Sequence, residues 1–202
     1  MKGQLPLGDS TPRKNFPYVT ISLIVINVIV FIWSLSDFDN IINTYGFTPL
    51  YPSILTLFTS MFLHGGIEHL AGNMWYLWIF GDNVEDALGK AKYTVLYFLS
   101  GLAADFFQYI TDPTSNVPSI GASGAISGIL GSYIVLFPNT KVYVGGESGI
   151  WPVPAWLMIG LWFALQLFLA LIGGGGDVAV WAHVGGFAFG YVFTKIWLRE
   201  QK

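Results

Sequence analysis

The chain has 202 residues, no cysteine and a formal net charge of -3. It is 53% hydrophobic, 17% aromatic and only 10% charged, with a mean hydropathy of +0.58. This is too apolar for a soluble domain and predicts an integral membrane protein in a lipid bilayer. The absence of cysteine excludes disulfides, thiolate metal sites and cysteine nucleophiles. We expect no metal, no cofactor and no nucleic-acid partner.

Six apolar segments follow one another along the chain, each long enough to cross roughly 30 Å of hydrocarbon as a helix. They cover residues 18–35, 55–80, 93–110, 120–137, 155–172 and 178–198. Residues 1–17 are expected to form a disordered cytosolic arm, residues 18–198 one six-helix membrane domain and residues 199–202 a cytosolic tail. The predicted fold class is an all-α membrane protein with six transmembrane helices.

The basic residues predict the orientation, because Lys and Arg near the ends of spans stay on the cytoplasmic side. With the amino terminus inside, every Lys and Arg falls inside, several of them in an expected loop over residues 82–92. The outer loops hold Asp37, Asp39, Asp112 and Asp177 and no basic residue. We therefore expect a multi-pass protein of the cell membrane with both termini in the cytoplasm.

Five polar side chains fall at similar depths in the outer half of this topology. Ser123 lies about one turn, or about 5 Å, inside the fourth segment, and His183 lies about five residues inside the sixth. His69 and Asn73 share one face of the second segment, with His64 one turn above them. Such residues inside a membrane indicate function by default. Serine, histidine and asparagine also serve as hydrogen-bonding glue between helices, so both interpretations stay open.

Small residues recur at every fourth position in two of the segments. Gly124 and Gly128 form one such ridge, and Ala182, Gly186 and Gly190 form another. Ridges of this kind let helices approach closely, and packing is their main expected role. Close approach also serves catalysis, because a serine oxygen and a histidine nitrogen must come within about 3 Å for proton transfer.

Three motifs in this order resemble those of the rhomboid intramembrane serine proteases. They are HGGIEHLAGN at residues 64–73, GASG at 121–124 and AHVGGFAFG at 182–190. The segment FGDNVED at residues 80–86 is similar to that family as well. The resemblance extends over about residues 18–198 and implies a six-helix rhomboid-like bundle.

The resemblance also implies a mechanism and a substrate class. Ser123 would attack a peptide carbonyl and form an acyl-enzyme, and His183 would take the serine proton. His69, Asn73 and the backbone N–H of Ser123 would line the oxyanion hole. The supporting residues would be His64, Gly121, Gly124, Gly186 and Gly190. Substrates would be transmembrane proteins, cleaved in a site that opens to the non-cytoplasmic side, while the oligomeric state is left open.

One position departs from the family. Some members carry a tyrosine stacked on the catalytic histidine where this chain has Ser127. Support for His183 must then come from elsewhere, for which Gly186, Trp181 and Phe187 are the candidates. Neither Asp105 nor Asp177 is linked to the histidine by a motif, so a dyad is expected rather than a triad.

A flexible gate beside His183 is also predicted. Residues 173–176 are four consecutive glycines, which are costly to order. They follow the fifth segment, which carries the aromatic residues Trp156, Trp162 and Phe163. We expect this loop and segment to open laterally toward lipid, although a flexible connection without that role explains the same glycines.

Other function classes fit the residues less well. An intramembrane metalloprotease needs His-Glu-x-x-His, but here Glu68 and His69 are adjacent and His64 is five residues away. Residues 174–177 match the Gly-x-Gly-Asp pattern of an aspartyl protease but fall in a loop. A transporter would show an internal repeat, which the chain lacks. The alternative that stays open is a rhomboid-like scaffold that binds membrane proteins without cleaving them.

Overall fold

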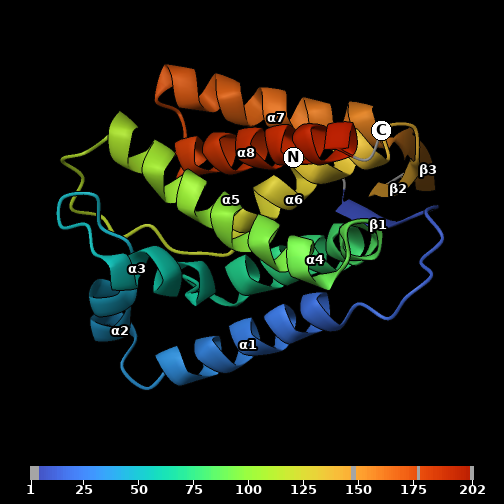
Figure 1. Cartoon of the computed structure of the whole chain (residues 1–202). Coiled ribbons are helices and arrows are strands. Elements are labelled where there is room, and N and C mark those ends of the chain that lie inside the picture. The colour runs from blue at the N-terminus through green and yellow to red at the C-terminus, as the bar shows by residue number, and fades with distance from the viewer. Residues whose placement is uncertain (1–4, 147–148, 177, 201–202) are drawn as a thin grey trace.

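The computed structural model describes residues 5–146, 149–176 and 178–200 (Figure 1). The helices are α1 (Tyr18–Ser34), α2 (Phe38–Tyr45), α3 (Ile54–Thr59), α4 (Ile67–Leu88), α5 (Lys90–Thr111), α6 (Ser123–Leu136), α7 (Ala155–Ile172) and α8 (Val180–Glu200), with a 3-10 turn η1 (Ser60–Phe62). The strands are β1 (Leu5–Asp9), β2 (Lys141–Gly146) and β3 (Gly149–Pro154). Asp177 lies outside the described residues.

Helix α6 forms the centre of the bundle. All residues from 124 to 133 are buried, and α4, α5 and α8 pack around them. Helix α1 lies outside α4, and α7 lies along α8 on the opposite side (Figure 1). Ser123 is the first residue of α6, so the packing of this central helix places the serine at the inner end of a loop, among three neighbouring helices.

Glycines bring α6 and α8 into backbone contact. A Cβ added to Gly186 would meet the carbonyl oxygen of Gly124, and one added to Gly190 would meet that of Gly128. A Cβ on Gly128 would in turn meet Ser100 of α5. These positions leave no room for a side chain, so the crossing depends on both ridges.

The second predicted span is not one helix. The chain forms α3 and η1, becomes extended at Leu63, and begins α4 only at Ile67. His64 therefore lies in the segment that leads into α4 instead of one turn above His69 on the same helix. Two consecutive glycines, Gly65 and Gly66, interrupt the helical pattern here, since glycine is unfavourable within a helix.

The loop expected over residues 82–92 is also wrong. Helix α4 continues to Leu88 and α5 begins at Lys90, so only Gly89 separates them. Gly89 has φ of 77°, a left-handed conformation that glycine adopts at no steric cost. Its N–H donates to the carbonyl of Glu85 and closes the end of α4. Charged residues lie on the ends of helices here, which the sequence could not distinguish from a loop.

The other five predicted spans coincide with α1, α5, α6, α7 and α8 to within a few residues. By length and apolarity alone, α7 is the one helix of the described chain that meets the requirement for crossing a membrane. Helices α1 and α6 are apolar but have 17 and 14 residues. The six-span topology and the cytoplasmic location of both termini stay predictions.

The fold is mostly helical but not all-α, because the strands form an antiparallel sheet in the order β1-β2-β3. Residues 5–9, expected to be disordered, form its edge strand. In β2 the side chains alternate, with Val142 and Val144 buried between exposed neighbours, the period of a half-buried strand. The indole nitrogen of Trp75 on α4 donates to the carbonyl of Pro6 at 2.6 Å and fastens β1 to the bundle.

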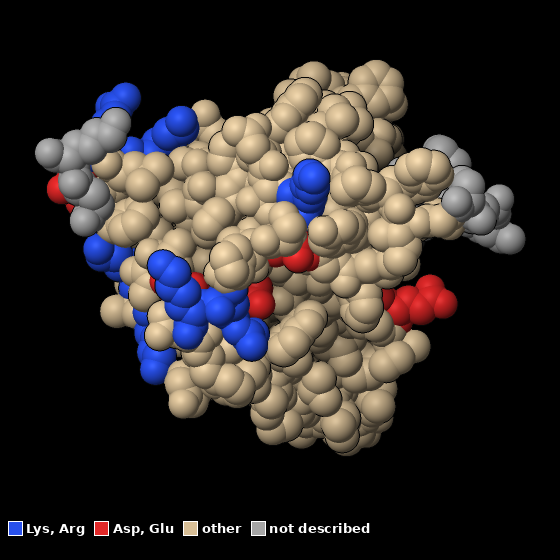
Figure 2. All heavy atoms as spheres, turned by 90° about the vertical axis from the view of Figure 1, so that its right-hand side faces the viewer, with Lys and Arg blue, Asp and Glu red and all other residues tan. Residues whose placement is uncertain are grey.

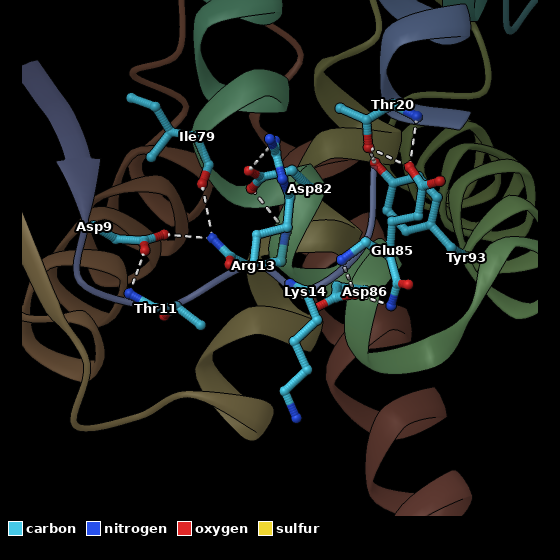
Figure 3. Close-up of polar contacts among 12 residues, drawn as sticks. Asp9, Thr11, Arg13, Lys14, Thr20, Ile79, Asp82, Glu85, Asp86 and Tyr93 are labelled. Carbon is cyan, nitrogen blue, oxygen red and sulfur yellow. Dashed lines mark hydrogen bonds and ion pairs between the residues drawn. The ribbon is translucent and has the colours of Figure 1, made fainter. Parts of the chain in front are cut away.

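The FGDNVED segment of α4 holds the N-terminal residues in place (Figure 3). The Glu85 carboxylate accepts hydrogen bonds from the backbone N–H groups of Val19 and Thr20 at 3.0 and 2.8 Å. It thereby caps α1, whose first amides have no partner within the helix. Asp86 accepts from the backbone N–H groups of Lys14 and Asn15 in the same way.

Asp9 ties the end of β1 to two helices. Its carboxylate accepts hydrogen bonds from Asn83 Nδ2 of α4 at 2.7 Å and from the Tyr133 hydroxyl of α6 at 2.9 Å. Burial raises the pKa of the Asp9 carboxyl above its usual range, against the lowering effect of its hydrogen bonds. The N-terminal segment is thus an integral part of the fold around α4 and α6.

Candidate active site

Ser123 and His183 meet at the crossing of α6 and α8. The Ser123 Oγ and His183 Nε2 atoms lie 2.9 Å apart, within hydrogen-bonding distance. Both side chains are only half-buried and line one cavity. The structure therefore brings together a hydroxyl and an imidazole in the arrangement that nucleophilic catalysis requires.

The other ring nitrogen of His183 has a partner that the sequence did not reveal. His183 Nδ1 lies 2.8 Å from Oε1 of Gln166 on α7. An amide oxygen can only accept a hydrogen bond, so Nδ1 carries the proton in this arrangement. Nε2 then has a free lone pair, which can accept the Ser123 hydroxyl proton.

His69 has the opposite arrangement. The backbone N–H of Gly65 donates to His69 Nδ1 at 3.2 Å, so the proton of the neutral ring is on Nε2. Gly121, with φ of 123°, lies directly under this nitrogen: a Cβ on Gly121 would be 2.8 Å from His69 Nε2 and 3.6 Å from Ser123 Oγ. A hydrogen-bond donor therefore lies close to the serine oxygen.

Two further donors lie at the start of α6 and on α4. The backbone N–H of Ser123 is in the first turn of α6, where amides have no partner within the helix. The carbonyl of Ser60 accepts from the Gly121 N–H at 2.9 Å and so fixes the loop that leads into this turn. Asn73 is buried, lines the same cavity and uses one N–H to donate to the carbonyl of His69 at 2.8 Å.

His64 and Ser127 lie beside these residues. The ring of His64 is completely buried and packs edge-on against His69, with 5.1 Å between ring centroids. Within the described residues neither of its nitrogens has a hydrogen-bond partner. Ser127 donates to the carbonyl of Ser123 one turn earlier at 2.6 Å, so its hydroxyl bonds to its own helix and not to His183.

The aromatic residue beside His183 is Trp162 of α7, with 6.0 Å between the ring centroids. The alternatives suggested by the sequence, Trp181 and Phe187, are not its ring partners; Phe187 stacks on Phe163 instead, at 4.2 Å. Gln166 gave one signal that was overlooked: it is the only polar side chain in residues 155–172. A lone amide in an apolar segment needs a partner inside the protein.

The cavity has a volume of about 1040 Å³ and extends from the serine to the far side of α5. Ser123, His183, His69 and Asn73 line one part of it. Asp105 and Ser60 line another, with their side-chain oxygens 3.5 Å apart. Asp105 thus shares the cavity but has no contact with His183, whose third partner is the amide of Gln166.

Residues 51–200 match the Rhomboid domain. The chain is 31% identical over 195 residues to Rhomboid protein 1, mitochondrial, of Saccharomyces cerevisiae, a match that covers 91% of this chain and 53% of that protein. It is 30% identical over 146 residues to the putative rhomboid protease YdcA of Bacillus subtilis, covering 72% of this chain and 68% of the relative. The chain belongs to the rhomboid family.

Membership of the rhomboid family confirms the resemblance seen in the motifs and makes the chain an integral membrane protein. A third relative, rhomboid protease GluP of B. subtilis, is 37% identical over 89 residues, which are 44% of this chain and 17% of GluP. This rhomboid spans about half the length of the yeast relative. Proteases by name are thus among its relatives.

Proposed function

We propose that this rhomboid is an intramembrane serine protease that cleaves transmembrane proteins through a Ser123–His183 dyad. The observation that carries the proposal is the 2.9 Å contact between Ser123 Oγ and His183 Nε2, together with an Nδ1 that faces an acceptor. A serine hydroxyl is a weak nucleophile and needs an adjacent base of this kind. No metal or cofactor takes part in the reaction proposed.

In the first half of the reaction, Ser123 Oγ adds to the scissile carbonyl carbon while its proton passes to His183 Nε2. The carbonyl oxygen becomes an oxyanion, stabilised by the Ser123 backbone N–H and by Nε2–H of His69, with Asn73 as a further donor. His183 then protonates the leaving amine as the C–N bond breaks. An ester between Ser123 and the amino-terminal part of the substrate is left.

In the second half, a water molecule takes the place of the departed amine. His183 Nε2 accepts a proton from this water as its oxygen adds to the ester carbonyl, and the same donors stabilise the second oxyanion. The imidazolium then returns the proton to Ser123 Oγ. A carboxylic acid is released and the free serine is restored, so the histidine gains and loses one proton in each half.

The cavity is suited to an extended peptide. A peptide carbonyl in a regular helix is hydrogen-bonded and covered by the following turn, so it cannot reach Ser123. The volume of about 1040 Å³ leaves room for several residues in extended conformation. We infer that the substrates are transmembrane segments that unwind at one end, and that the site opens to the non-cytoplasmic side.

The test is cleavage of defined transmembrane substrates by the purified chain in proteoliposomes, read as product fragments by mass spectrometry. We expect the parent to cleave at least one substrate, with Ser123→Ala and His183→Ala lowering kcat at least about 10³-fold. Ser22→Ala, a matched change on the exposed face of α1, should keep parental activity.

Two outcomes would contradict the protease. One is a parent that binds transmembrane substrates without producing fragments, which would indicate a binding scaffold in place of an enzyme. The other is a Ser123→Ala variant as active as the parent. Thermal unfolding of each variant in detergent would show that a loss of kcat does not reflect loss of the fold.

A further inference from the structure

Gln166 stands out because it contacts the reacting histidine from a helix that otherwise presents apolar side chains. We infer that Gln166 is a positioning residue that holds His183 in its base tautomer, and that the dyad is complete only while α7 is docked on α8. The inference rests on the proposed protease function and concerns a contact outside the three sequence motifs.

The chemical argument begins with the two nitrogens of His183. With Nδ1–H donating to Gln166 Oε1 at 2.8 Å, Nε2 is the acceptor toward Ser123. Without an acceptor at Nδ1 the ring is free to adopt the other tautomer, in which Nε2 carries a hydrogen and cannot take the serine proton. Gln166 thus has the position that a carboxylate has in a Ser-His-Asp triad, without the negative charge.

The mechanical argument comes from the packing of α7. This helix has 18 residues but buries only Ala155, Ile159 and Ala170 among them. It lies at the edge of the bundle along α8 (Figure 1). Near the site its contacts with α8 are the Phe163–Phe187 stack and the approach of Trp162 to His183.

The two arguments together link substrate entry to chemistry. Ser123 and His183 are on the tightly packed pair α6 and α8, while the acceptor for Nδ1 is on the loosely packed α7. Movement of α7 away from α8, which would admit a transmembrane segment, removes Gln166 from His183. Return of α7 restores the contact, so the serine is activated only after the helix has closed.

The experiment compares kcat, KM and the pH profile of the full chain in proteoliposomes for Gln166→Leu and Gln166→Glu. Leucine cannot accept a hydrogen bond, so we expect kcat to fall at least about tenfold with KM within about twofold of the parent. Glutamate keeps the acceptor and adds a charge that favours the imidazolium. Gln166→Glu should therefore retain activity, with the acidic limb of its pH profile displaced upward by about one unit.

Leu165→Ala is the matched control, because Leu165 is the exposed neighbour of Gln166 on α7. The inference is overturned if Gln166→Leu behaves like this control, if it changes KM instead of kcat, or if Gln166→Glu is as inactive as Gln166→Leu. A parental pH profile for Gln166→Glu would overturn it as well. In each case an active parent beside an inactive Ser123→Ala would leave the protease itself intact, whereas an inactive parent would remove both.

Discussion

At the scale of single residues, two histidines of the same cavity hold opposite tautomers. The backbone N–H of Gly65 points at Nδ1 of His69, and the amide oxygen of Gln166 points at Nδ1 of His183. One ring therefore offers Nε2–H as a donor and the other offers Nε2 as a base. This difference follows from the hydrogen bond at the far nitrogen of each ring, and it assigns His69 to the oxyanion and His183 to the proton.

Gly121 is the residue whose change tests this assignment. Gly121→Ala would place a methyl group 2.8 Å from His69 Nε2 and would force alanine into a φ of 123°, which L residues rarely adopt. We expect the donor to be displaced and kcat to fall about 10²-fold, the size of a lost oxyanion contact. Kinetics of cleavage would measure it.

The control for this prediction is Gly160→Ala on α7, where an added Cβ meets no atom within 4 Å. Parental kcat in Gly121→Ala, at the stability of the parent, would contradict the placement of His69 above the serine. A loss of kcat in both variants would show that the assay responds to any added methyl group.

At the scale of elements, the active site depends on how closely α6 and α8 cross. Gly190→Ala would press a methyl group against the Gly128 carbonyl oxygen, since backbone on both sides cannot yield. Overpacking of this kind costs about 1–3 kcal/mol, and we expect a lower Tm together with reduced cleavage. Thermal unfolding in detergent measures the first effect.

Gly72→Ala on α4 is the comparison, because a Cβ there meets nothing within 4 Å and alanine favours a helix more than glycine does. Its Tm should equal or exceed that of the parent. Equal Tm values for Gly190→Ala and the parent would mean that α6 and α8 do not need backbone contact, and the origin of the Ser123–His183 distance would have to lie elsewhere.

At the scale of the whole molecule, charge separates the two ends of the bundle. The described Lys and Arg residues gather at the end that holds the sheet, as Figure 2 shows on one face. They are Arg13, Lys14, Lys90, Lys92, Lys141, Lys195 and Arg199. Asp37, Asp39 and Asp112 lie near α2 and the end of α5, on the opposite side in Figure 1. The arrangement favours a cytoplasmic location for the sheet.

Single cysteines can test this orientation, because the chain has none of its own. Asn139→Cys lies at the sheet end and Thr114→Cys at the opposite end, both exposed. In intact cells a membrane-impermeant maleimide should label Thr114→Cys and reach Asn139→Cys only after permeabilisation. The reverse pattern would place the active site on the cytoplasmic side and contradict the predicted orientation.

The sequence could predict those parts of this molecule that follow from composition and local pattern. Five helices and the membrane class were predicted because apolar length is a local property. The break before Ile67, the continuation of α4 to Leu88 and the β1 pairing depend on contacts between distant segments. Gln166 was missed for the same reason, since its role arises only when α7 lies beside His183.

The most direct measurement of the central claim is the site of covalent attachment of a fluorophosphonate to the intact protein in detergent. The probe forms a bond only with a serine oxygen that a neighbouring base has activated. We predict a single adduct, located by peptide mass spectrometry on Ser123 and abolished in His183→Ala. An unlabelled parent, or an adduct on a different serine, would contradict the Ser123–His183 dyad.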